Sequence, residues 1–127
     1  MKSMKTAILI HSDPKSGTEE ALGRVFNGLA VAHDLKQKNE EVRVLFIGTG
    51  TRWLAELSKT DHPVHELFEG VKDKIDGASS ACSDAFGATE DVKNAGFVLL
   101  TGNALPGTSG LPSVADLMTE GYQILVY

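Results

Sequence analysis

Short apolar runs alternate along the chain with stretches in which apolar residues recur at helical spacing. Residues 5–10 and 42–47 are nearly continuous apolar runs rich in β-branched side chains, which is typical of strands buried on both faces of a sheet. Between these runs, apolar residues over 22–35 follow a helical period, and Ser16 with Glu19 fits the capping box that begins a helix. The pattern therefore predicts a strand, a long helix and a second strand.

The same alternation continues to the end of the sequence. Glycine and proline punctuate it, because Gly48 and Gly50 end the second strand and Pro63 stands where the first turn of a helix tolerates proline. A short helical turn is expected over residues 53–57. The remaining predicted elements are a helix over 63–75, a strand of small residues over 77–82, a helix from Thr89 to Gly96, a strand over 97–101, a helix from Ser113 to Gly121 and a strand over 122–127.

Strands that alternate with helices place the chain in the α/β class. The order βαβαβαβαβ, with strands apolar on both faces, predicts a three-layer sandwich with a mostly parallel five-stranded sheet and right-handed crossovers. At 127 residues the chain is long enough to bury a core of its own. No repeat, linker or low-complexity segment divides it, so a single domain over residues 1–127 is expected.

Composition and charge exclude several classes of function. The chain carries 17 acidic and 12 basic side chains, and its lysines are scattered, whereas nucleic-acid binding requires clustered Lys and Arg. The apolar run at residues 7–10 is shorter than the roughly 7–15 residues of a signal peptide or the roughly 20 of a membrane span. We therefore expect a cytoplasmic protein with no membrane partner. The loop over residues 12–17 has one glycine and lacks the dinucleotide-binding pattern, and no P-loop sequence is present, so no cofactor is expected.

Polar side chains follow each of the first four predicted strands. In an open parallel sheet, ligands bind beyond the carboxyl ends of the strands, where these side chains would meet on one rim. The candidate catalytic residues are Cys82 and His11, and the candidate ligand-binding residues are Ser12, Asp13, Thr49, Gly50, Ser83 and Asn103. His62 and His65 have no further ligand close in sequence, so no metal site is predicted.

Cys82 is the only cysteine, and it follows a run of small residues where the third strand is expected to end in a loop. A single cysteine excludes an internal disulfide and a C-x-x-C redox pair. The residues from Ser83 to Thr89 include no arginine, which disfavours the anion-binding loop of cysteine phosphatases and rhodaneses. His11 would stabilise a Cys82 thiolate if the two side chains come within hydrogen-bond reach. An inert cysteine that only fills space is the alternative.

The chain resembles the DsrE/DsrF-like family over nearly its whole length. The features that carry the resemblance are the order of elements, Cys82 before the segment 83–87, the opening strand 6–10 and the closing segment 121–127. The resemblance implies a parallel α/β sandwich that forms a homotrimer or homohexamer. In the sulfur-relay members, the cysteine at the place of Cys82 carries sulfur as a persulfide and hands it to a partner. Sulfur donor and acceptor proteins are thus the implied partners, and no other residue receives a role from the resemblance.

Three hypotheses for the function follow. The first is a cytoplasmic sulfur-relay protein, a sulfurtransferase or persulfide carrier, in which Cys82 accepts sulfane sulfur and donates it by thiol exchange. The second is a binding or assembly module of the same fold that holds a small ligand or anion on the rim, with a non-catalytic cysteine. The third is a hydrolytic or redox enzyme that uses His11 and Asp13. A lone thiol without a resolving cysteine favours the first.

Overall fold

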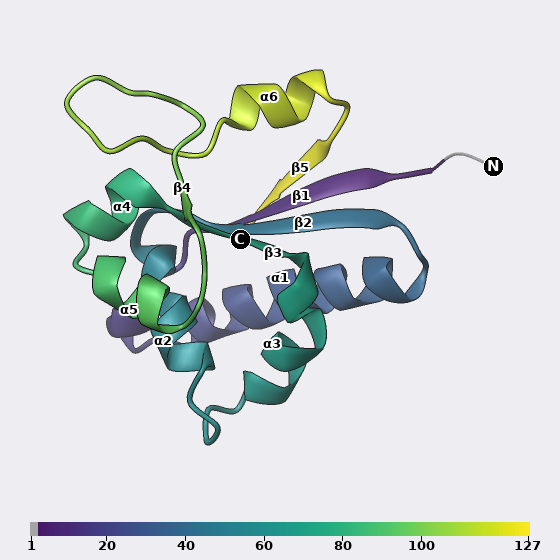
Figure 1. Ribbon diagram of the computed structural model, residues 1–127. Helices are drawn as coiled ribbons and strands as arrows, with labels where there is room; N and C mark the ends of the chain where they lie inside the picture. Colours follow the sequence, from purple (N-terminus) through teal and green to yellow (C-terminus); the bar gives the residue numbers. More distant parts are fainter. Residues whose placement is uncertain (1–2) are drawn as a thin grey trace.

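The five predicted strands form one parallel sheet (Figure 1). The computed structural model describes residues 3–127, and its strands lie in the order β4-β3-β2-β1-β5, each parallel to its neighbours. The strands are β1 (Lys5–Ile10), β2 (Glu41–Phe46), β3 (Ile75–Ser79), β4 (Leu99–Leu100) and β5 (Gln123–Val126). The predicted five-stranded parallel sheet is confirmed.

Helices fill the connections and cover both faces of the sheet. They are α1 (Glu19–Gln37), α2 (Trp53–Leu57), α3 (His65–Val71), α4 (Ser80–Ala85), α5 (Thr89–Asn94) and α6 (Val114–Thr119), with the 3-10 helices η1 (Pro14–Ser16), η2 (Gly48–Arg52) and η3 (Lys72–Lys74). Because β1 to β4 are added in one direction, right-handed crossovers place α1, α2, α3 and α5 on one face, and the returning connection to β5 carries α6 across the other. The short helix α4 lies at the end of the sheet, directly after β3. Figure 1 shows this three-layer arrangement, as the sequence predicted. Within residues 3–127, none of these helices has the length and apolar character needed to cross a membrane.

Alternate residues of the central strands face the two helical layers. Ile8 and Ile10 of β1 belong to the larger core, beneath α1, α2, α3 and α5, whereas Ala7 and Leu9 belong to a smaller core with Leu117 of α6. The four strand residues are at most 5% exposed. This burial on both faces is the reason that β1 reads as a continuous apolar run in the sequence.

Several element boundaries differ from the sequence-based expectation. α1 begins after Thr18, whose hydroxyl accepts a backbone hydrogen bond, and Ser16 belongs to the preceding turn and does not cap the helix. The predicted helix over 63–75 is shorter, because β3 already begins at Ile75. The predicted strand over 97–101 is reduced to the two residues of β4, since only these pair with β3.

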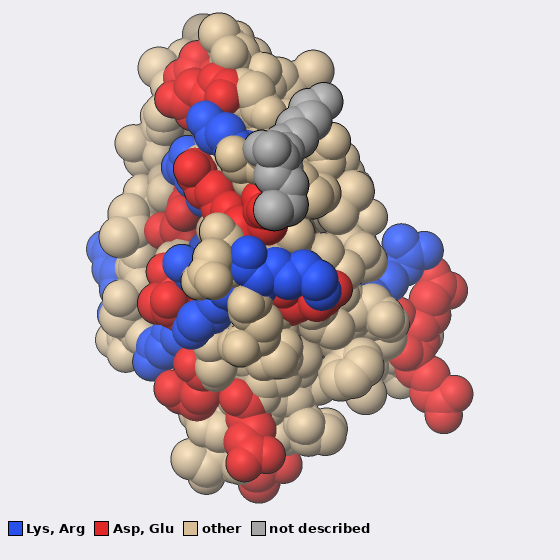
Figure 2. Space-filling view, turned by 90° about the vertical axis from the view of Figure 1, so that its right-hand side faces the viewer, with Lys and Arg blue, Asp and Glu red and all other residues tan. Residues whose placement is uncertain are grey.

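Charged side chains form a network near the amino ends of the strands. Arg43 of β2 pairs with Asp76 of β3 at 2.6 Å, and its guanidinium lies over the ring of Tyr122, 5.4 Å from the ring centre. Tyr122 in turn donates a hydrogen bond to Glu41. Burial raises the pKa of Asp76 even though Arg43 opposes this shift. Figure 2 shows that basic and acidic side chains are interleaved on the side of the molecule where β1 begins, so this side offers no basic stripe to a polyanion.

The backbone of η2 packs closely against the end of β1 at Gly50. A Cβ atom at this position would lie 2.1 Å from the carbonyl oxygen of Ile10. That distance is far inside van der Waals contact, and the obstructing atom belongs to the backbone of a buried strand, so it cannot move aside as a side chain would. Gly50 therefore fixes the segment that follows β2 against the end of β1.

We predict that Gly50→Ala lowers the free energy of unfolding by about 1–3 kcal/mol, the usual cost of overpacking. The control is Gly23→Ala in α1, where an added Cβ meets no atom within 4 Å. This control should raise the free energy of unfolding by about 0.4–1 kcal/mol, because alanine restricts the unfolded chain. Urea denaturation followed by circular dichroism measures both, and equal stabilities of Gly50→Ala and the wild type would refute the close approach.

Candidate functional site

Cys82 lies in the first turn of α4, which begins immediately after β3. Ser79, the last residue of β3, caps this helix, because its hydroxyl accepts a hydrogen bond from the backbone N–H of Cys82 at 3.3 Å. The expected strand over 77–82 that ends in a loop is therefore wrong at its carboxyl end. Cys82 is partly exposed, whereas the neighbouring Ser83 is fully buried and donates to the Ser79 carbonyl at 2.7 Å. Of the two, only Cys82 is open to a ligand or partner.

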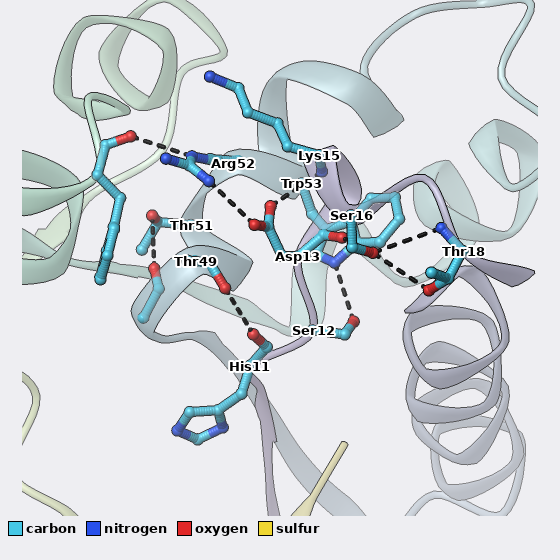
Figure 3. Close-up of polar contacts among 12 residues, drawn as sticks. His11, Ser12, Asp13, Lys15, Ser16, Thr18, Thr49, Thr51, Arg52 and Trp53 are labelled. Atoms are coloured by element: carbon cyan, nitrogen blue, oxygen red, sulfur yellow. Dashed lines mark hydrogen bonds and ion pairs between the residues drawn. The ribbon is translucent and has the colours of Figure 1, made fainter. Parts of the chain in front are cut away.

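Arg52 connects the segments that follow β1, β2 and β3 (Figure 3). It ends η2, pairs with Asp13 at 3.0 Å, and donates from Nε to the carbonyl of Phe86 at 3.1 Å. Phe86 caps the carboxyl end of α4, so one side chain ties the first loop to the helix that carries Cys82. Sequence reasoning looked for an arginine after Cys82 and missed this one, because spacing along the chain gives no signal for a contact made by the fold.

The polar side chains expected to bind a ligand after β1 and β2 are engaged with the protein itself. The hydroxyl of Ser12 donates to a carbonyl of α1 at 3.1 Å and accepts from the indole N–H of Trp53 at 3.1 Å. Asp13 uses one oxygen for the arginine pair and the other for a backbone N–H. Thr49 donates to the carbonyl of His11 at 3.1 Å (Figure 3). These contacts hold the rim together.

His11 lines a cleft of about 330 Å³ at the ends of β1 and β5, together with residues that include Asp13, Arg24 and Tyr127. Cys82 does not line this cleft. β2 lies between β1 and β3, so the ends of the two strands are roughly 10 Å apart. No hydrogen bond joins His11 to Cys82 within residues 3–127, and the structure thus does not pair the two candidate catalytic residues.

A larger cleft, of about 540 Å³, opens between α4 and the loop over residues 101–112. The connections from β3 and β4 leave toward opposite faces of the sheet at this point, which is where open α/β sheets bind ligands. We call it the switch-point cleft. Its lining residues are Ala81, Asp84, Ala85, Gly107, Thr108 and Ser109. Ala81 immediately precedes Cys82, so the cleft borders the turn that carries the thiol.

Asp84 holds the loop over 101–112 against α4. Its carboxylate accepts a hydrogen bond from Ser109 at 2.7 Å, and the hydroxyls of Ser109 and Ser80 lie 2.7 Å apart. The backbone N–H of Ala81 donates to the carbonyl of Gly110 at 2.8 Å. The wall of the switch-point cleft is thus built by contacts between α4 and a loop far away in sequence.

Asn103 lies apart from the other candidate residues. Its backbone N–H and C=O both bond to Leu111, which closes the base of the loop. It lines a third cleft, of about 340 Å³, with Ile47 and Val114 on the α6 side of the sheet. The candidate residues therefore do not share a single cleft: His11 and Asn103 line separate clefts, and neither lines the switch-point cleft.

The rings of His62 and His65 make internal contacts. His62 Nδ1 accepts a hydrogen bond from the backbone N–H of Val64 at 3.0 Å, and His65 Nδ1 lies 2.7 Å from the carbonyl oxygen of Leu57. Burial lowers the pKa of His62, which favours its neutral form. In the described part of the chain, no group of three His, Cys, Asp or Glu side chains is arranged to hold a metal ion.

These features define the class of protein. It is a parallel α/β sandwich in which a lone, partly exposed cysteine stands at the start of a helix at the switch point of the sheet. The family model of the DsrE/DsrF-like family matches residues 4–127, and the chain belongs to this family.

Two known proteins are similar to the chain over most of its length. One is the uncharacterized protein MJ0733 of Methanocaldococcus jannaschii, which is 30% identical over 122 residues, or 96% of this chain and 94% of that protein. The other is the solved structure of the conserved protein of unknown function BT1422 from Bacteroides thetaiotaomicron. It covers 97% of this chain and 94% of its own, with a TM-score of 0.64 and 19% identity, and so supports the fold alone.

We expect Asp84 to make the closure of the loop dependent on pH. Hydrogen bonds from Thr89 and then Ser109 hold the pKa of its carboxyl below the ordinary value of 3.8. A lowered carboxyl pKa stabilises the folded contact above the unfolded-state value, and this contribution is lost as the pH falls through the folded-state value. We predict that the loop leaves α4 as the pH is lowered below 3.8, and that the amide resonances of Ser109 and Ala81 shift together.

The variant Asp84→Ala should show the acid positions of these resonances already at neutral pH. The control is Asp73→Ala. The pKa of Asp73 is also lowered, but by a hydrogen bond from Lys36, which is not part of the loop. In this control, the amide resonance of Ser109 should shift with pH as it does in the wild type. A loop that stays closed at low pH, or one that opens equally in both variants, would contradict the role of Asp84.

Proposed function

We propose that this DsrE/DsrF-like protein is a sulfur-relay protein in which Cys82 carries sulfane sulfur as a persulfide. The observation that carries the proposal is the placement of the lone cysteine, which is partly exposed in the first turn of α4 and directly follows Ala81, a lining residue of the switch-point cleft that Cys82 itself does not line. Membership of the family supports sulfur-relay chemistry.

The transfer is a pair of thiol exchanges. The Cys82 thiolate attacks the outer sulfur of a donor persulfide, the S–S bond of the donor breaks, and the donor cysteine leaves as a thiolate. Cys82 then holds the outer sulfur as a persulfide. An acceptor thiolate attacks that sulfur in the same way, and Cys82 leaves as a thiolate, so each step conserves electrons and returns the carrier unchanged.

The switch-point cleft is where donor and acceptor proteins would dock. Two exposed apolar side chains are close to its lining in sequence, Phe86 directly after Ala85 and Leu105 two residues before Gly107, with exposed fractions of 38% and 46%. Exposed apolar groups beside a cleft are typical of contact with another protein. A cytoplasmic location remains a prediction from the short apolar run at residues 7–10, and assembly as a homotrimer or homohexamer remains a prediction of the family resemblance.

The cleft at His11 supports a second function, a small-ligand or anion-binding module with a non-catalytic cysteine. The observation that favours this function is the cleft of about 330 Å³, which His11 and Arg24 line and Cys82 does not. A ligand there would raise the melting temperature equally in the wild type and in Cys82→Ser. An enzyme that uses His11 and Asp13 has less support, because both carboxylate oxygens of Asp13 already accept hydrogen bonds.

Intact-mass spectrometry after incubation with inorganic polysulfide tests the relay. We predict that the wild type gains sulfur on Cys82, that Cys82→Ser gains none, and that an added low-molecular-weight thiol removes the sulfur. The control is the double variant Cys82→Ser with Thr60→Cys, which moves the lone thiol to an exposed turn. The control should load more slowly, because the relocated thiol stands away from the rim where donor and acceptor would dock.

A wild-type protein that gains no sulfur would remove the proposal. Equal loading rates for the wild type and the relocated thiol would show that the position of Cys82 confers nothing. In that case the binding module would become the better description of the protein.

A further inference from the structure

β5 is an edge strand with one open side. It pairs only with β1, and nothing in the described part of the chain pairs with its other edge. The next residue shows how the strand is oriented, because Tyr127 donates to the Leu9 carbonyl at 2.9 Å and accepts from the His11 N–H at 2.7 Å. The backbone groups of Tyr127 therefore point toward β1.

Alternation along a strand then assigns the remaining backbone groups. Successive residues direct their N–H and C=O groups to opposite edges, so Leu125 faces β1 as Tyr127 does. Ile124 and Val126 point the other way, toward the open side. Neither forms a hydrogen bond through these groups with any residue in the range 3–127. Two N–H and two C=O groups thus form a free hydrogen-bonding edge.

This edge lacks the usual protection against pairing. Edge strands are normally blunted by charged side chains, proline, a bulge or very short length. The four residues Gln123–Val126 include no charge and no proline, and the side chains of Leu125 and Val126 are 37% and 61% exposed. The opposite edge of the sheet, by contrast, is protected because β4 has only two residues. Only the β5 edge is built to accept another strand.

We propose that β5 pairs antiparallel with β5 of a second copy of this chain, across a two-fold axis that passes beside Leu125. In that register Ile124 lies opposite Val126 of the second copy, and the two residues exchange both backbone hydrogen bonds. Val126 and Ile124 of the second copy exchange the same two hydrogen bonds, so all four open groups on each copy are satisfied. Leu125 meets its own counterpart in the position between them.

A second copy satisfies every open backbone group of the β5 edge, and it brings only uncharged side chains together. The open residues are two apart, and the residue between them lies on the two-fold axis, so the edge is complementary to itself. Each cross-strand neighbour is apolar, and no like charges are brought together, which favours such pairs. Pairing with the β4 edge would satisfy fewer groups and would leave β5 open on the next copy. The symmetric contact closes after two chains.

Sedimentation velocity of two matched lysine variants tests the contact. Val126→Lys places a charge on the β5 edge, and Val98→Lys places the same charge beside β4, at a valine that is 62% exposed against 61% for Val126. We predict that the wild type and Val98→Lys form assemblies of the same mass, which contain an even number of chains. The Val126→Lys assembly should have half that mass. The mass is halved whether a dimer separates into single chains or a hexamer separates into trimers.

A second variant separates loss of the contact from loss of the fold. Val126→Pro removes an N–H that points to the open side and leaves the bonds to β1 in place, as proline permits on an edge. It should also halve the mass, while the amide protons of Leu125 and Tyr127 stay protected from exchange. A wild type that sediments as one chain or as an odd number, or Val126→Lys and Val126→Pro assemblies of wild-type mass, would overturn the proposal. The outcome is independent of sulfur loading on Cys82, so it stands or fails apart from the proposed relay.

Discussion

The structure depends on the preference of parallel strands for right-handed crossovers. Four strands are added in one direction, so their helices gather on one face, and the single reversal after β4 sends the last connection across the other face. The ends of β3 and β4 must then separate. That separation produces the largest of the three clefts at the carboxyl ends of the strands, and α4, with Cys82 in its first turn, forms one wall of it. The position of the only cysteine is thus a consequence of sheet topology.

The ends of β3 and β4 separate at this rim, and polar contacts between distant segments hold the surrounding loops and helices in place. Arg52 joins the first loop to the end of α4 through Asp13 and Phe86, and Asp84 joins α4 to the loop over 101–112. A partner that exchanges a sulfur atom needs a fixed thiol more than a flexible one, because reacting atoms must meet in a narrow geometry. The polar residues of this rim therefore hold neighbouring segments together, and Arg52 and Asp84 do so for the helix that carries Cys82.

Periodicity in the sequence predicted the fold well, because strands buried on both faces and an amphipathic helix leave strong patterns. β1 matches its predicted bounds, since a run that is apolar at every position cannot be placed elsewhere without exposing it. The segment around Cys82 was misassigned because Ala and Ser have little periodicity, so a capped short helix and a strand of small residues look alike. The roles of Arg52 and the burial of Ser83 depend on contacts between distant segments, and no local pattern encodes them. For the same reason, the sequence could not show that the candidate residues lie at separate clefts.

The most direct test of the account is whether Cys82 reacts in the folded protein or only after unfolding. Its alkylation rate by a small thiol reagent should be compared between the wild type and the destabilised Gly50→Ala background under native conditions. A thiol presented by the native fold reacts at the same rate in both. If the reaction instead required global unfolding, the rate would rise about tenfold for each 1.4 kcal/mol of lost stability, and the proposed carrier role would be contradicted.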